Sequence, residues 1–299
     1  MPKKVLLCVL ALVLSAGCVP PEPDDDLQRT FDAETTVMGR IQAAGVLLVA
    51  VPDDRPTLAD PASQEGFVAG LGQEVADSLG VDLELIGAPN EELIPLVDAG
   101  QVDLVFPAVS ITEQRVRQDS DKHLFLDPYL VAHQRLLVKG NAVPSDFATR
   151  DLAGESVCAL VDPDTDIDIS DIEPSIDLQG TIVPDECASL LARDEVAAVT
   201  GSDVVLLGIG TSLCGAEACE GGSAVLVGEQ ISTFGYGPVI EGRASSWKDY
   251  VENVLEEAQQ EGRWQALYEK YLTGLSNGEV LEPPGMTVEE AAALFPKEL

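Results

Sequence analysis

Short apolar runs alternate with amphipathic stretches along most of this chain of 299 residues, and this alternation limits the folds open to it. Residues 46–51 are apolar throughout, which is typical of a buried strand. Residues 66–79 place Phe67 and Leu71 at helical spacing, and Gly80 ends that pattern. Strands that alternate with amphipathic helices predict an α/β protein, in which mixed sheets are flanked by helices.

The alternation occurs in two sets, which are joined by extended segments. Residues 129–139 follow the first set, and residues 224–228 follow the second. Two α/β units joined by two crossings predict a hinged protein of two lobes with a cleft between them. We expect lobe 1 to comprise residues 41–136 and 232–273, lobe 2 to comprise residues 137–231, and a tail to comprise residues 274–299.

The tail contains one recognisable signal for a helix. Thr287-Val288-Glu289-Glu290 is a capping box, in which a threonine side chain and a glutamate side chain each bind a backbone N–H at the start of a helix. We therefore expect a short helix that packs on lobe 1.

The N-terminus is typical of an export signal. Lys3 and Lys4 precede an apolar run over 5–14, which is too short to span a bilayer as a mature helix. Ser15-Ala16-Gly17-Cys18 then resembles a bacterial lipobox, although Ser15 occupies the place where many lipoboxes have leucine. The resemblance implies that residues 1–17 are removed and that a lipidated Cys18 anchors the protein to the outer face of the cell membrane. An ordinary signal peptide is the alternative.

The charge balance excludes some partners. The chain has 52 acidic and 17 basic residues and a formal charge of −35, so it should repel nucleic acid. The acidic, proline-rich start of the mature chain predicts an extended tether over residues 18–40. An anionic ligand would need a local cationic pocket, because the overall field opposes it.

Four cysteines remain after the signal is removed and Cys18 takes a lipid. They are Cys158, Cys187, Cys214 and Cys219. An even number in an exported chain favours two disulfides, and three pairings are formally open. The simplest joins Cys158 to Cys187 and Cys214 to Cys219, because the last two lie close together in a glycine-rich segment. The two histidines lack metal-ligand spacing to these cysteines, so we expect no metal and no cofactor.

Several motifs occur in an order that resembles a known family. They are Gly66-Phe67, Gly100-Gln101-Val102-Asp103-Leu104, Ser110-Ile111-Thr112-Glu113-Gln114-Arg115, Asp127-Pro128-Tyr129 and Glu261-Gly262-Arg263-Trp264. Together they resemble the family 3 extracellular solute-binding proteins of polar amino-acid ABC transporters. More narrowly, Asp54-Arg55-Pro56 and the pair Cys158 and Cys187 resemble the actinobacterial glutamate-binding lipoproteins. The resemblance implies a periplasmic-binding-protein type II fold that closes around its ligand.

The resemblance also implies a site in lobe 1. Arg115 aligns with the arginine that holds the ligand α-carboxylate, and a planar bidentate donor in the first turn of a helix suits that role. Ser110 would add a hydroxyl and a backbone donor, and Ala108 completes the set. Arg55 either contacts a side-chain carboxylate of an acidic ligand or lies on a surface loop.

Lobe 2 departs from the family pattern. Ser202 occupies the place of the aspartate that usually pairs with a ligand ammonium, and Asp203 follows it. Either Asp203 takes that role after a local shift, or the amine is bound differently, or the ligand has none. In the family, a Gly-Ser/Thr-Thr turn of lobe 2 normally donates hydrogen bonds to the ligand carboxylate. In this chain only Thr165 keeps a hydroxyl for that role.

These features predict a monomeric substrate-binding lipoprotein of an ABC importer, which captures a glutamate-like or aspartate-like amino acid or a related carboxylate and docks on permease subunits. The chain has no nucleophile elbow, Walker loop or zinc-protease helix, so we expect no enzyme. The alternatives are a sensing module that presents its bound state to a receptor, and an enzyme like cyclohexadienyl dehydratase on the same fold.

Overall fold

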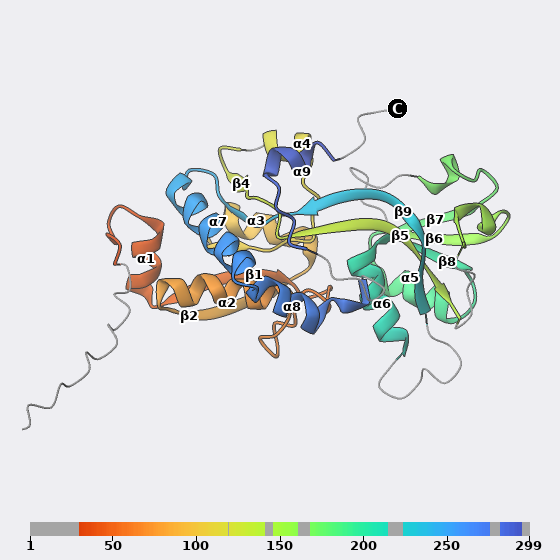
Figure 1. The fold of residues 1–299 in the computed structure, drawn as a ribbon, viewed down its shortest axis with the longest axis horizontal. Coiled ribbons are helices and arrows are strands. Elements are labelled where there is room, and N and C mark those ends of the chain that lie inside the picture. The colour runs from red at the N-terminus through yellow and green to blue at the C-terminus, as the bar shows by residue number, and fades with distance from the viewer. Residues whose placement is uncertain are drawn as a thin grey trace, which may run out of the picture.

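The computed structural model describes residues 30–118, 120–140, 146–160, 168–214, 224–275 and 282–294. Their helices and strands form two sheets with helices packed against them (Figure 1). None of the helices in these residues has the length and apolar character that crossing a membrane requires.

The sheet of lobe 1 has five strands in the order β2-β1-β3-β10-β4. Its strands are β1 (Val46–Pro52), β2 (Asp82–Ala88), β3 (Leu104–Val105), β4 (His123–Phe125) and β10 (Val239–Glu241). β1 is parallel to β2 and β3, whereas β10 is antiparallel to β3 and β4. The mixed sheet arises because β10 returns from the other lobe instead of following a helical crossover.

Helices cover the lobe 1 sheet and bury large aromatic side chains against it. They are α1 (Val37–Ala44), α2 (Phe67–Leu79), α3 (Leu93–Asp98), which follows the short 3-10 turn η1 (Asn90–Glu92), α4 (Glu113–Arg117), α7 (Ser245–Gln260) and α8 (Arg263–Tyr271). Phe67, Trp247 and Trp264 are fully buried in one apolar cluster of this lobe. The Trp264 indole N–H donates to the Tyr129 carbonyl at 2.8 Å, so this large ring is buried without an unpaired polar atom.

The sheet of lobe 2 has the order β7-β6-β8-β5-β9. Its strands are β5 (Leu130–Lys139), β6 (Ser156–Leu160), β7 (Asp177–Thr181), β8 (Ala198–Ser202) and β9 (Ala224–Tyr236). The helices of this lobe are α5 (Pro184–Ala192) and α6 (Asp203–Cys214), and two short 3-10 turns, η2 (Thr149–Leu152) and η3 (Ile169–Asp171), accompany them. A disulfide between Cys158 and Cys187 fastens α5 to β6, as predicted.

β5 and β9 are the two crossings between the lobes, and Figure 1 shows them running side by side from one sheet toward the other. They pair antiparallel from Leu130↔Tyr236 to Lys139↔Ala224, with a register shift between Gln134 and Leu136. The expected lobe boundaries at residues 136 and 232 fall inside these two strands. The second crossing was predicted over 224–228 only. It is longer because β5 pairs with residues 224–227 and, beyond the register shift, again with residues 232–236.

Other sequence predictions need correction at element ends. The predicted tether reaches residue 40, but α1 already begins at Val37, because Thr36 caps it and Met38 and Ile41 are buried. In lobe 2, α5 begins at Pro184, since proline suits a first helical turn. The capping box of the tail is confirmed: the Thr287 hydroxyl accepts from the Glu290 N–H, and the Glu290 carboxylate accepts from the Thr287 N–H, at the start of α9 (Val288–Ala292).

Candidate functional site

Arg115 lies on α4 in lobe 1. Its Nη1 donates to the Ser110 carbonyl at 3.0 Å, and its side chain is half-buried. The expected anion site at a helix N-terminus is weaker than the sequence suggested, because α4 has only five residues and the Thr112 hydroxyl already accepts the Arg115 N–H at 3.2 Å. Any anion bound here would therefore depend mainly on the guanidinium itself.

The segment that leads to Arg115 is attached to the second crossing. Ser110 is buried and forms a β-bridge with Tyr236, and the Ile111 N–H donates to the Gly235 carbonyl at 2.8 Å. This attachment places Ser110 at the lobe 1 end of β9. Residues 110–111 and the end of β9 are thus joined by hydrogen bonds.

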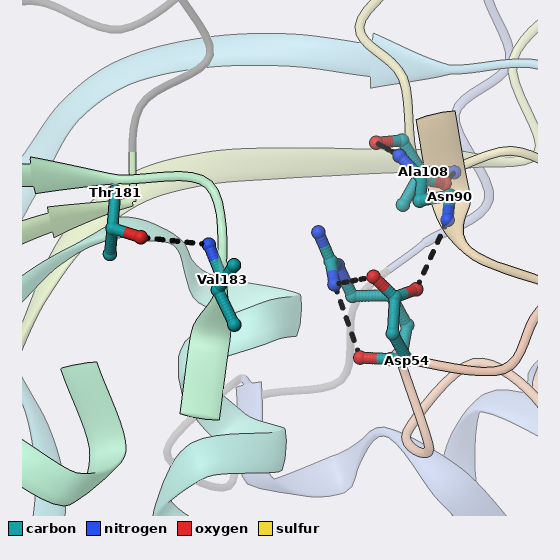
Figure 2. Close-up of polar contacts among 6 residues, drawn as sticks. Asp54, Asn90, Ala108, Thr181 and Val183 are labelled. Carbon is teal, nitrogen blue, oxygen red and sulfur yellow. Dashed lines mark hydrogen bonds and ion pairs between the residues drawn. The ribbon is translucent and has the colours of Figure 1, made fainter. Parts of the chain in front are cut away.

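Asn90 holds the backbone of Ala108, and sequence reasoning did not select it. Its side-chain oxygen accepts the Ala108 N–H at 2.8 Å, and its side-chain nitrogen donates to the Ala108 carbonyl at 3.1 Å (Figure 2). Both backbone groups of Ala108 therefore have a partner within the protein. Ala108 was predicted to contact the ligand, and this geometry gives its backbone a structural role at the edge of the site.

Arg55 is not the solvated surface arginine that the sequence left open. Its side chain is only 12% exposed, and Nη1 lies 2.6 Å from Asp54 Oδ2. Burial raises the pKa of Asp54, and the positive charge of Arg55 opposes that shift. The Arg55 Nε is buried and has no hydrogen-bond partner among the described residues. Leaving such a donor unpaired is costly, so the environment of Arg55 favours an additional acceptor.

Ser202 and Asp203 lie at the end of β8 and the start of α6, where they have different environments. The Asp203 Oδ1 accepts from the His133 N–H at 3.1 Å and from the Val204 N–H at 2.9 Å, and burial raises the pKa of this carboxyl to about 7. Asp203 thereby connects β5 to α6. The neighbouring Ser202 is 9% exposed, and its buried hydroxyl has no partner among the described residues.

Arg135 is a buried cation near these residues that sequence reasoning missed. It lies on β5, where it is 8% exposed. Its charge opposes the rise of the Asp203 pKa that burial causes, and it contributes to the lowered pKa of His133. Burial is the larger cause of the lowered His133 pKa. A buried charge needs compensation, so the burial of Arg135 sets it apart from a surface arginine. No clear signal in the sequence indicated this burial, because His133 and Gln134 make the same part of β5 polar.

The lobes meet beside these groups. The Thr57 hydroxyl, two residues after Arg55, donates to the Val204 carbonyl of α6 at 3.0 Å. Figure 2 shows the lobe 1 contacts of Asp54, Asn90 and Ala108 on one side and Thr181 and Val183 of lobe 2 on the other. The Val183 N–H donates to the Thr181 hydroxyl at 3.1 Å at the start of α5. The Arg55 loop of lobe 1 is thus joined directly to the start of α6, which carries Asp203.

Three of the predicted residues lie outside the part of the chain that the structure describes. They are Cys18, Thr165 and Cys219. The side chain of Cys214, the predicted partner of Cys219, is also outside it. Lipidation, the second disulfide and the contribution of Thr165 remain predictions.

Two α/β lobes joined by two crossing strands define the type II architecture of periplasmic binding proteins. Residues 47–274 match the bacterial extracellular solute-binding proteins, family 3, and the chain belongs to that family. The sequence prediction of the family is therefore confirmed. The family match ends before the tail that carries α9.

Two curated relatives are similar over part of the chain. A glutamine-binding protein of Geobacillus stearothermophilus is 26% identical over 146 residues, which are 45% of this chain and 54% of the relative. The L-cystine-binding protein TcyJ of Escherichia coli K12 is 25% identical over 158 residues, which are 52% of this chain and 54% of the relative. The chain thus spans about half the length of these relatives, and both are named as binding proteins rather than as enzymes.

Solved structures share the fold. A mutant of ArgBP from T. maritima aligns with a TM-score of 0.60 at 22% identity, covering 79% of this chain and 99% of that one. An ancestral cationic amino acid solute-binding protein, AncCDT-1, aligns with a TM-score of 0.64 at 21% identity, again covering 79% and 99%. Both have the type II architecture predicted from the sequence.

Proposed function

We propose that this chain is an extracytoplasmic substrate-binding lipoprotein of an ABC importer, which captures a polar or acidic amino acid, or a related carboxylate, between its two lobes. The observation that carries the proposal is a pair of unsatisfied buried atoms. Arg55 Nε in lobe 1 and Ser202 Oγ in lobe 2 are buried polar atoms without partners among the described residues. A ligand that accepts from Arg55 and exchanges a hydrogen bond with Ser202 would satisfy one group in each lobe.

The charges near this junction favour an acidic solute. Arg55 lies two residues from the interlobe contact of Thr57, and Arg135 acts on Asp203 beside that contact, although the whole chain has only 17 basic residues. Arg115 lies in lobe 1, bonded to Ser110 near the end of β9. Such a concentration of cations provides the local field that an anion needs against an overall charge of −35. The relatives are named for glutamine and cystine, which are amino acids and therefore carry an α-carboxylate, as glutamate and aspartate do. The resemblance to glutamate-binding lipoproteins agrees with an acidic side chain.

A ligand screen tests the proposal. We would measure thermal shifts and then calorimetric affinities for L-glutamate, L-aspartate, L-glutamine, L-arginine, L-cystine and glutarate, which lacks an amine. A solute at about 100 times its Kd should stabilise the protein by roughly 2.7 kcal/mol. We expect L-glutamate, L-aspartate or glutarate to give the largest shift. A preference for L-arginine would contradict the acidic solute, and the absence of any shift would contradict the binding function.

Arg115 provides the matched mutational test. Removing a desolvated charge-assisted pair costs on the order of 2–5 kcal/mol, so Arg115→Ala should weaken the affinity at least thirty-fold while the protein stays folded. Arg117→Ala is the control, because Arg117 lies on the same helix with a side chain 78% exposed and pairs with Glu113. Equal affinities in the two variants would exclude Arg115 from the binding site.

The anchor is tested separately. Cys18→Ala should release the protein from the membrane fraction, and intact-mass measurement of the wild-type protein should show acyl chains on Cys18. An unmodified mature N-terminus would contradict the lipoprotein assignment without affecting the binding proposal.

A further inference from the structure

The C-terminal strap, residues 282–294, lies beyond the family match yet is packed against the site segment. Its helix α9 has five residues, too few to be stable alone in water, so tertiary contacts must hold it in place. Val288, Ala291 and Ala292 are buried in the same apolar cluster as Ile111. Figure 1 shows α9 beside α4, and the two helices are in contact.

The strap also reaches the lobe 1 ends of both crossings. The Val288 N–H donates to Asp127 Oδ1 at 2.8 Å, three residues before β5 begins. On the other crossing, Gly235 of β9 is packed so closely that an added Cβ would lie 3.0 Å from the Ala291 Cβ. One short helix therefore contacts the entrance of β5 and the end of β9.

A polar network fixes this arrangement to α7. The Asp127 N–H donates to Glu252 Oε1 at 3.1 Å, and Lys248 pairs with the same Glu252 oxygen at 2.5 Å. Asp127 thus uses its backbone to bind α7 and its side chain to bind the strap. Displacing the strap would deprive the Asp127 carboxylate of the hydrogen bond that it accepts from the Val288 N–H.

The residues beneath the strap are those that hold Arg115. Ile111, which packs in the cluster with Ala291, donates its N–H to Gly235, and Ser110 bridges Tyr236. α4 follows immediately and carries Arg115. The strap consequently packs where the end of β9 meets residues 110–117, the segment that carries Arg115.

We propose that the C-terminal strap is a positioning element of the binding site, which holds residues 110–117 in register with the lobe 1 ends of the two crossings. This inference rests on the proposed role of Arg115 for its functional meaning. The contacts of the strap do not depend on that role.

Hydrogen exchange of the full-length protein without ligand provides the test. Val288→Asp places a charge in the buried cluster and should detach α9, so exchange should rise at residues 288–292. If the strap positions the site, exchange should also rise at least ten-fold at residues 110–117 and 234–238. Strands β6 and β8 of lobe 2 should keep their protection and serve as the internal reference. Glu289→Ala, on the exposed face of α9, should leave every rate unchanged.

Two results would overturn the inference. One is release of residues 288–292 with no change at 110–117; the other is an equal rise in all segments, which would make the strap a general stabilising element. Thr287→Ala, which removes only the helix cap, gives the same comparison in milder form if Val288→Asp does not fold. Because no ligand is present, failure of the proposed function would appear in the ligand screen and not in this measurement.

Discussion

Asp203 makes the stability of this protein depend on pH in a direction that can be worked out from its surroundings. Burial raises the pKa of its carboxyl from 3.8 to about 7, although backbone N–H groups and the charge of Arg135 favour the ionised form. The folded protein therefore holds this proton more tightly than the unfolded chain does. Between about pH 4 and pH 7 the contribution of Asp203 to stability falls as the pH rises.

The size of the effect follows from the size of the shift. Each pKa unit corresponds to about 1.4 kcal/mol, so a shift of roughly three units gives about 4 kcal/mol as an upper value. Asp203→Asn removes the titration, and its side-chain oxygen can still accept from His133 and Val204. We expect the variant and the wild type to be similarly stable near pH 4, and the variant to be up to about 4 kcal/mol more stable at pH 8.

Urea unfolding from pH 4 to pH 8 would measure this difference, with the fluorescence of the buried Trp247 and Trp264 as the signal. The control is Asp249→Asn, which makes the same chemical change at an exposed residue of α7. A difference between Asp203→Asn and wild type that is constant from pH 4 to pH 8 would refute the assignment of a raised pKa to Asp203.

Three further predictions concern stability. Replacing both Cys158 and Cys187 by serine should cost about 3–4 kcal/mol, because the disulfide closes a loop with a sequence separation of 29; urea unfolding under oxidising conditions measures it, and an unchanged midpoint would contradict it. Gly66→Ala should lower Tm by several degrees, since Gly66 has φ of 135° and an added Cβ would lie 2.4 Å from the Leu58 carbonyl oxygen. Calorimetry would compare it with Gly100→Ala, where φ is also positive but nothing lies within 4 Å of the added Cβ, so the difference in Tm measures the effect of the clash. Trp264→Phe should cost about 1–3 kcal/mol or more, because it leaves the buried Tyr129 carbonyl without its indole donor; a loss no greater than that of Tyr271→Phe, on the same helix and only half-buried, would show that this bond is unimportant.

The polar parts of the site show where sequence reasoning failed. Arg55 could not be placed from sequence, because a loop arginine is equally compatible with a surface and with a buried ion pair. Asp203 as a replacement for the usual ammonium partner stays a prediction; the structure adds that its Oδ1 accepts the backbone N–H groups of His133 and Val204, which the sequence did not indicate. Asn90 was missed because its partner, Ala108, lies 18 residues further along the chain. Arg135 was missed because the residue that it acts on, Asp203, lies on another element.

The sequence by itself determined the α/β alternation, the end of α2, the start of α9 and the family, because these depend on local periodicity and on caps such as Gly80 and the Thr287 capping box. Only the tertiary structure decided which polar groups are satisfied. Whether Arg55 Nε, Ser202 Oγ or the Ala108 N–H has a partner depends on side chains brought together by two sheets and two crossing strands. Those contacts carry no period along the chain, so no pattern of residues could have predicted them.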